Sequence, residues 1–170
     1  FAGCRRFVYN KALDLQDARM KSNVRLHSYP ELCKVLTQWR HSKEAVFLAE
    51  APTHPLQQAL KDLGRGFENF FAGRAKYPRP KKKSRTDSFR YPDPKQFKVD
   101  AKNSRVFLPK LGWVRYRKSR EIEGVVKQIT VVRSGDDWFV CIQTEQEVAV
   151  QQSDSISTAI SPMSSRLSLT

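Results

Sequence analysis

The sequence predicts an α+β protein in which a helical half is followed by a small, mainly antiparallel β unit. Apolar residues recur with a helical period over the first 72 residues, and short segments beyond residue 88 alternate with the two-residue period of strands. Residues 74–120 hold 17 Lys and Arg but three acids, so this basic window carries +14, the net charge of the whole 170-residue chain. Such a concentration is typical of a protein that binds a polyanion, most often nucleic acid.

Three helices are expected in the first half. The opening helix has one apolar stripe formed by residues 4, 8, 12 and 15. Residues 28–30, Ser-Tyr-Pro, offer a start for the second helix, with proline in its first turn. The third helix follows Thr53-His54-Pro55 and has the clearest stripe, which consists of Leu56, Leu60, Leu63, Phe67 and Phe70.

The second half begins with a proline-rich segment that includes the run Lys81-Lys82-Lys83, a composition that favours neither helix nor central strand. Beyond it, the best hairpin candidate joins residues 125–132 to residues 138–144 through a turn that contains Gly135. The remaining expected strands are residues 88–91, 97–99, 105–108 and 113–116. The short antiparallel strands favour a barrel or a curled sheet.

The remaining composition narrows the class of protein. Residues 151–170 contain seven serines and no aromatic residue, so we expect a disordered tail. No apolar run approaches the length that spans a membrane, and no secretion signal is seen. The three cysteines are widely spaced and odd in number, which favours a reducing compartment over a disulfide framework.

No catalytic or metal-binding residues are expected in this chain. A two-metal nuclease needs several converging carboxylates, whereas the acids here are scattered. The pair Asp136-Asp137 is better explained as a turn between two strands. The cysteines and histidines lack the spacing of a zinc site, and Gly64-Arg65-Gly66 does not have the context of a phosphate loop. We therefore expect no cofactor.

The candidate binding residues lie on the opening helix and in the basic window. Lys and Arg bind phosphates by releasing counterions, and Arg also makes bidentate contacts with phosphates or guanine edges. Plain solvent exposure remains an alternative for the opening helix and for the triple-lysine run. The predicted nucleic-acid-binding residues are Arg5, Arg6, Asn10, Arg74, Lys76, Tyr77, Arg79, Lys81, Lys82, Lys83, Arg85, Arg90, Tyr91, Lys110, Arg115, Arg117, Lys118 and Arg120.

The basic window also holds seven aromatic residues, which could stack on unpaired bases or pack in the core. Core packing is the favoured interpretation for Phe89, Phe97, Phe107 and Trp113. For Tyr77, Tyr91 and Tyr116, which stand among charges, both interpretations stay open.

A series of motifs resembles the OrfB/TnpB family encoded by bacterial insertion sequences. They occur in the family's order and spacing over residues 1 to about 148. The motifs are Gly3-x-x-Arg6-x-x-Tyr9-Asn10-x-x-Leu13; Leu56-Gln57-Gln58-Ala59-Leu60-Lys61-Asp62-Leu63 with Phe67-x-Asn69-Phe70-Phe71; Tyr77-Pro78-Arg79-x-Lys81-Lys82; Asp87-Ser88-Phe89-Arg90-Tyr91; Leu108-Pro109-Lys110-Leu111-Gly112-Trp113-Val114-Arg115; and Arg120-x-Ile122-x-Gly124.

The resemblance implies a domain plan and a partner. Residues 1–75 would form a helical, helix-turn-helix-like recognition lobe, residues 76–148 a basic wedge-type β-barrel, and residues 149–170 the tail. Family members are transposon-encoded, RNA-guided DNA endonucleases, long described as transposases. The resemblance therefore implies guide RNA and target DNA as partners. It also implies a location in the prokaryotic cytoplasm, in association with the nucleoid. Mg and Zn are implied only for the family's C-terminal nuclease. The oligomeric state stays open.

The chain departs from the family pattern at both ends. It lacks an initiating Met and the family's first strand, so we expect it to begin within a protein. A RuvC-type strand would begin near residue 155, where a Ser-rich stretch stands instead; we hypothesise an out-of-frame tail. The expected function is binding without cleavage. The alternatives are the front of an active nuclease, a DNA-binding repressor of the element, or a decayed remnant.

Overall fold

The computed structural model describes residues 1–83, 87–146 and 164–169, the last of these as backbone alone. The chain divides into two compact units, Phe1–Phe89 and Arg90–Thr170. The first unit is helical and the second is built of strands, so the predicted α+β class is confirmed.

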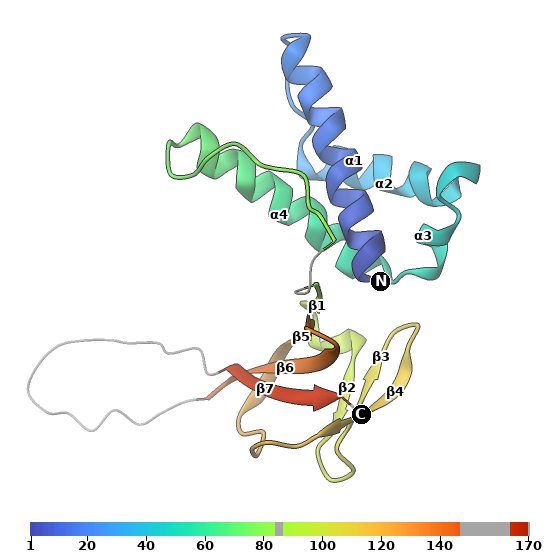
Figure 1. Ribbon diagram of the computed structural model, residues 1–170, viewed down its shortest axis with the longest axis vertical. Helices are drawn as coiled ribbons and strands as arrows, with labels where there is room; N and C mark the ends of the chain where they lie inside the picture. The colour runs from blue at the N-terminus through green and yellow to red at the C-terminus, as the bar shows by residue number, and fades with distance from the viewer. Residues whose placement is uncertain (84–86, 147–163, 170) are drawn as a thin grey trace, which may run out of the picture. The chain divides into compact units, whose positions relative to one another are not determined.

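Four α-helices form the helical unit: α1 (Ala2–Lys21), α2 (Tyr29–His41), the short α3 (Phe47–Glu50) and α4 (Thr53–Phe71). A 3-10 turn, Lys43–Ala45, precedes α3. The three longer helices confirm the sequence prediction, whereas the 3-10 turn and α3 have too few residues to show a period. In Figure 1, α4 lies beside α1 and α2, against both of which it packs.

The start of α2 is fixed by a capping box. Glu31 accepts hydrogen bonds from the Ser28 amide at 2.6 Å and from the Ser28 hydroxyl at 2.7 Å, and proline stands in the first turn. These bonds occupy a backbone donor that a helix start leaves without an intrahelical partner. The Arg25 and Ser28 donors lower the pKa of Glu31 to about 2.

The core of the helical unit follows the predicted stripes. Val8 and Ala12 of α1 are fully buried, and Cys4 and Leu15 pack against them at the edge. On α4 the residues of the predicted stripe are buried, except for the half-buried Phe70. Because both stripes face inward, the polar face of α1 is left to contact other segments.

Seven strands follow. They are β1 (Ser88–Tyr91), β2 (Lys98–Asp100), β3 (Arg105–Leu108), β4 (Gly112–Arg117), β5 (Val125–Ser134), β6 (Asp137–Glu145) and β7 (Ser164–Leu169), in the order β1-β5-β6-β7-β4-β3-β2 (Figure 1). A 3-10 turn, Pro94–Gln96, separates β1 from β2. The β5–β6 hairpin confirms the prediction, and its turn at Gly135 has the positive φ of +67° that favours glycine.

The strands form two small antiparallel sheets, β2–β3–β4 and β5–β6–β7, which two residue pairs between β4 and β7 connect. Among the described strands the order ends at β1 and β2 and does not close on itself, so the predicted barrel is not confirmed. These end strands have four and three residues, which is short for the staggered pairing that closes a barrel.

Strand β7 lies in the stretch that the sequence marked as disordered. Its backbone pairs with β6 from Gln143↔Ser164 to Phe139↔Ser168. An edge strand offers a row of free amides and carbonyls that any extended segment can use, whatever its composition. Serine-rich composition therefore does not by itself prevent a strand. Residues 147–163 and 170 lie outside the described residues.

Candidate nucleic-acid interface

The basic segment (residues 74–83) runs antiparallel to α1 within the helical unit. The Tyr77 hydroxyl bonds to Asp17, and four residues later the backbone of Lys81 bonds to Asn10. Beyond the basic segment, Asp87 pairs with Arg6. Successive residues of the chain thus contact positions ever closer to the start of α1, so this helix holds the segment in an extended conformation.

Asn10 fixes the middle of the basic segment through both ends of its amide. Its Oδ1 accepts a hydrogen bond from the Lys81 amide at 2.7 Å, and its Nδ2 donates to the Lys81 carbonyl at 3.0 Å. The Lys81 ammonium lies 5.1 Å from the centre of the Tyr9 ring, a cation–π contact. The structure shows Asn10 holding the backbone of a basic loop, and its contact with nucleic acid stays a prediction.

Tyr77 anchors the start of the extended course. Its ring meets Phe67 and Phe70 edge to face, at centroid distances of 5.6 and 5.1 Å. Burial and the hydrogen bond to Asp17 raise the pKa of Tyr77 to about 12. Its aromatic faces are therefore used inside the helical unit, and base stacking is the weaker of the two interpretations.

Arg5 and Arg6 have carboxylate partners. Arg5 pairs with Asp62 of α4 at 2.7 Å and also donates to the Ser88 carbonyl at 2.7 Å. Arg6 pairs with Asp87 at 2.5 Å. These guanidiniums were expected to lie in solvent or to contact nucleic acid. The structure gives them a third role, because they connect α1 to α4 and to Asp87 and Ser88, which follow the basic segment.

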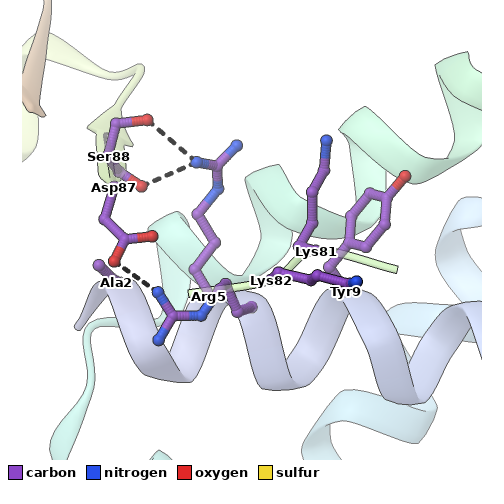
Figure 2. Close-up of a pocket in the computed structure, with 8 residues that line it drawn as sticks. Ala2, Arg5, Tyr9, Lys81, Lys82, Asp87 and Ser88 are labelled. Carbon is purple, nitrogen blue, oxygen red and sulfur yellow. Dashed lines mark hydrogen bonds and ion pairs between the residues drawn. The ribbon is translucent and has the colours of Figure 1, made fainter. Parts of the chain in front are cut away.

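A cavity of about 280 Å³ lies between α1 and the basic segment. Arg5, Arg6, Lys81 and Lys82 line it together with one carboxylate, that of Asp87. Figure 2 shows bonds from Arg5 to Ser88 and from the neighbouring arginine to Asp87, while Lys81 and Lys82 lie on the side of Tyr9. Charge-assisted hydrogen bonds from two such lysines suit an anionic oxygen cluster such as a phosphate.

The exposed cations of the basic segment have no carboxylate partner among residues 1–83 and 87–146. The segment contains no acid of its own, and the Arg74 guanidinium donates to the side-chain oxygen of Asn69 at 3.2 Å. Arg85 lies outside the described residues. The exposed side chains are those of Arg74, Lys76, Arg79, Lys81, Lys82 and Lys83.

The predicted cations of the β unit have mixed environments. Arg115 and Arg117 lie exposed on the same side of β4, and Lys110 and Arg120 are exposed beyond the strand ends. Lys118 instead pairs with Glu121 at 2.5 Å. Arg90 is half-buried on β1.

The division of the aromatic residues into buried and exposed ones differs from the one expected from the sequence. Tyr91 is fully buried and donates to the Pro109 carbonyl at 3.2 Å, so its ring offers no surface to a base; burial raises its pKa. Tyr116 is 3% exposed, and Phe89 and Phe97 are buried as expected. Trp113, expected in the core, is 49% exposed, because it occupies the open side of β4.

The described residues show neither a metal site nor a membrane-spanning helix. Among the described residues, no three His, Cys, Asp or Glu side chains come together in a way that could hold a metal ion. No described helix combines the length and apolarity needed to cross a membrane. The adjacent acids Asp136 and Asp137 lie at the β5–β6 turn, as expected, and Asp136 pairs with Arg133.

Comparison with known proteins identifies the family. A helix-turn-helix domain family of IS605-type OrfB proteins matches residues 1–24, which comprise α1 and the turn after it. A curated relative from Escherichia coli (strain K12), named "Putative RNA-guided DNA endonuclease InsQ", is 47% identical over 149 residues, 88% of this chain. A relative from Streptomyces pristinaespiralis, named "Putative RNA-guided DNA endonuclease", is 47% identical over 88 residues, 51% of this chain.

The chain spans 37% and 22% of the lengths of these two relatives. The family match at the opening helix and the identity over most of the chain confirm the resemblance carried by the sequence motifs. This chain belongs to the OrfB/TnpB family and corresponds to the N-terminal part of its members.

Proposed function

We propose that this chain is a transposon-associated nucleic-acid-binding part of a TnpB-like protein, which grips guide RNA and target DNA without cutting them. One observation carries the proposal: six exposed cations of the basic segment lie along α1 with no carboxylate partner among the described residues. The names of the two relatives support the choice of an RNA guide and a DNA target.

The proposed mode of binding follows from the way the basic segment is held. Asn10 and Tyr77 fix its backbone before any ligand arrives, so less conformational entropy is lost on binding than for a free loop. The ammonium groups remain in solvent, where each can replace a counterion at a phosphate. The cavity lined by Lys81 and Lys82 receives one phosphate of the backbone.

In this proposal the helical unit acts as the recognition lobe and the β unit as the wedge domain of the family. Cleavage, with its Mg ions and zinc ribbon, belongs to the C-terminal nuclease of the full-length proteins. The described residues supply phosphate contacts and the scaffold that positions them.

The decisive experiment is to purify the chain and sequence the nucleic acid that comes with it. A discrete RNA from the 3′ end of the transposon is expected. Absence of bound nucleic acid at low salt would overturn the proposal. Because the family match at α1 is a helix-turn-helix domain, footprinting on the DNA ends of the element tests the second candidate, a repressor. A protected DNA site in the absence of RNA would favour the repressor.

The role of the basic segment can be measured separately. Changing Lys81, Lys82 and Lys83 to Ala should flatten the salt dependence of duplex binding by up to about three phosphate contacts. The matched control changes Lys21, Lys34 and Lys43 to Ala, which removes the same charge from exposed positions elsewhere in the helical unit. Equal slopes for the two triple variants would show that net charge alone matters.

A further inference from the structure

The sheet β2–β3–β4 has one open side that combines aromatic and cationic residues. Alternation along each strand places Val106, Leu108 and Tyr116 on the buried side. The register sets Phe107 beside Trp113 and Arg105 beside Arg115 on the other side. We call this open side the platform face; it consists of Lys98, Asp100, Arg105, Phe107, Trp113, Arg115 and Arg117.

Trp113 is held in place on the platform face by its neighbours. Phe107 meets its ring edge to face, at a centroid distance of 5.6 Å. The Arg105 guanidinium lies 4.6 Å from the centre of the ring and donates from Nε to Asp100 at 2.8 Å. Asn103 also donates to Asp100. The hydrogen bonds from Asn103 and, to a smaller extent, from Arg105 lower the pKa of the Asp100 carboxyl to about 2. The indole is therefore half exposed yet ordered before any ligand binds.

A polar cavity of about 420 Å³ adjoins the platform face. Asn103, Ser104, Arg105, Arg115 and Tyr116 line it. The Tyr116 amide donates a hydrogen bond to the Ser104 carbonyl at 2.9 Å, which fixes the backbone beside this cavity. Of the two guanidiniums at this cavity, that of Arg105 is paired with Asp100, and that of Arg115 is the one that favours an anionic ligand.

We propose that the platform face binds an unpaired nucleotide of single-stranded RNA, with its base on Trp113 and its phosphate at Arg115. Every base has a face that can stack on an indole or a guanidinium plane, and the positive charge complements the phosphate. The choice of RNA rests on the Ser104 hydroxyl and the Asn103 amide of the cavity, which suit a ribose 2′-hydroxyl, the group that distinguishes RNA from DNA. The inference rests on the proposed function and adds a site and a ligand class to it.

The test compares single-stranded and fully paired RNA. Trp113→Ala should weaken binding of a short oligouridylate by about tenfold, the range expected for loss of one stacked base. Binding of a blunt RNA duplex should not change. Trp113→Phe should retain most of the affinity, since a smaller ring still stacks. Leu111→Ala, which trims another exposed apolar side chain from the same hairpin, is the matched control and should change neither affinity.

The outcomes separate this site from the proposed function. If Trp113→Ala leaves oligouridylate binding intact, or weakens duplex binding equally, the platform assignment is overturned, while the triple-lysine experiment still tests the basic segment. If the matching oligodeoxyuridylate binds as tightly as the RNA, the choice of RNA is overturned. Should Trp113→Ala fail to fold by circular dichroism, Arg115→Ala takes its place and must weaken oligouridylate binding more than Leu111→Ala does.

Discussion

The basic segment and the platform face present cations in two different ways. In the basic segment the cations stand on an extended chain whose backbone is held by α1 through Asn10. In the platform face they stand on paired strands, where register fixes the neighbours of Trp113. The first arrangement leaves flexible lysines free to follow a phosphate backbone, whereas the second offers a rigid surface of fixed spacing. We infer that the two surfaces divide sequence-independent gripping from contact with unpaired bases.

A second difference lies within the helical unit itself. Arg5 and Arg6 are as basic as the lysines of the segment, but Asp62 and Asp87 pair with them. Such partly buried pairs tie elements together, while unpaired exposed lysines remain available for a ligand. Positive charge in the sequence therefore indicates a binding surface only where the folded chain places no carboxylate in an ion pair with it.

The largest expected effect comes from Gly124→Ala, which should destabilise the β unit alone. Gly124 has φ of +79°, and an added Cβ would stand 2.4 Å from the Glu145 carbonyl oxygen. Backbone strain and this overlap should lower the free energy of unfolding by at least about 2 kcal/mol. Urea unfolding in a Trp39→Phe background measures the two units separately, because tryptophan fluorescence then comes only from Trp113 and Trp138 of the β unit and helical circular dichroism reports on the other unit.

The control for Gly124→Ala is Gly135→Asn. Gly135 also has positive φ, but nothing lies within 4 Å of an added Cβ, and asparagine tolerates this conformation. Its cost should stay below about 1 kcal/mol. If Gly124→Ala destroys helical signal and duplex binding as thoroughly as it destroys the β unit, the comparison between two separate surfaces breaks down.

An intermediate effect is expected from Asn10→Ala, which cuts the basic segment loose without changing its charge. Loss of two hydrogen bonds to the Lys81 backbone should cost about 1–2 kcal/mol of unfolding free energy. Duplex affinity should fall, because the segment must then be ordered on binding. The salt slope should persist, since every cation remains.

The control for Asn10→Ala is Gln38→Ala, which removes an exposed amide from α2. It should alter neither stability nor binding. Stability and duplex affinity equal to those of the wild-type chain would contradict the holding role, because they would mean that the basic segment keeps its course without the two Asn10 hydrogen bonds.

The helices were predictable because their evidence is local. The stripe on α4 and the Ser28–Glu31 capping box each lie within a few turns of sequence. The ion pair between Arg6 and Asp87 was not predictable in this way, since the two residues lie 81 positions apart and nothing nearby signals the pairing. Nothing in the sequence around Asn10 indicates that its side-chain amide hydrogen-bonds to the backbone of Lys81, 71 residues away.

The strands show where a period is informative and where it stops. Period two places Phe89 and Tyr91 on one side of β1 and Trp113 opposite Tyr116 on β4, and both relations hold in the structure. The period does not say which side another layer covers. Trp113 was therefore assigned to the core although it lies on the open side, and Tyr116 is the buried residue.

The smallest expected effect concerns Tyr77, which anchors the basic segment and should make it sensitive to alkaline pH. Burial and the Asp17 bond raise the Tyr77 pKa from 10.0 to about 12 in the folded chain. A folded pKa above the unfolded one favours the protonated phenol, so this stabilisation is complete below pH 10 and is lost as pH rises toward 12. Solvent screening should keep the effect below about 1 kcal/mol.

Tyr77→Phe isolates this anchor from other tyrosines whose pKa values are also raised, such as Tyr29 and Tyr116. Phenylalanine keeps the ring contacts with Phe67 and Phe70 but cannot ionise or donate to Asp17. The stability advantage of the wild-type chain over this variant, measured by urea unfolding at successive pH values, should therefore shrink between pH 10 and about 12. A stability difference that stays constant across this pH range would mean that the Tyr77 hydroxyl does not hold the basic segment. The edge-to-face contacts alone would then fix the start of this segment.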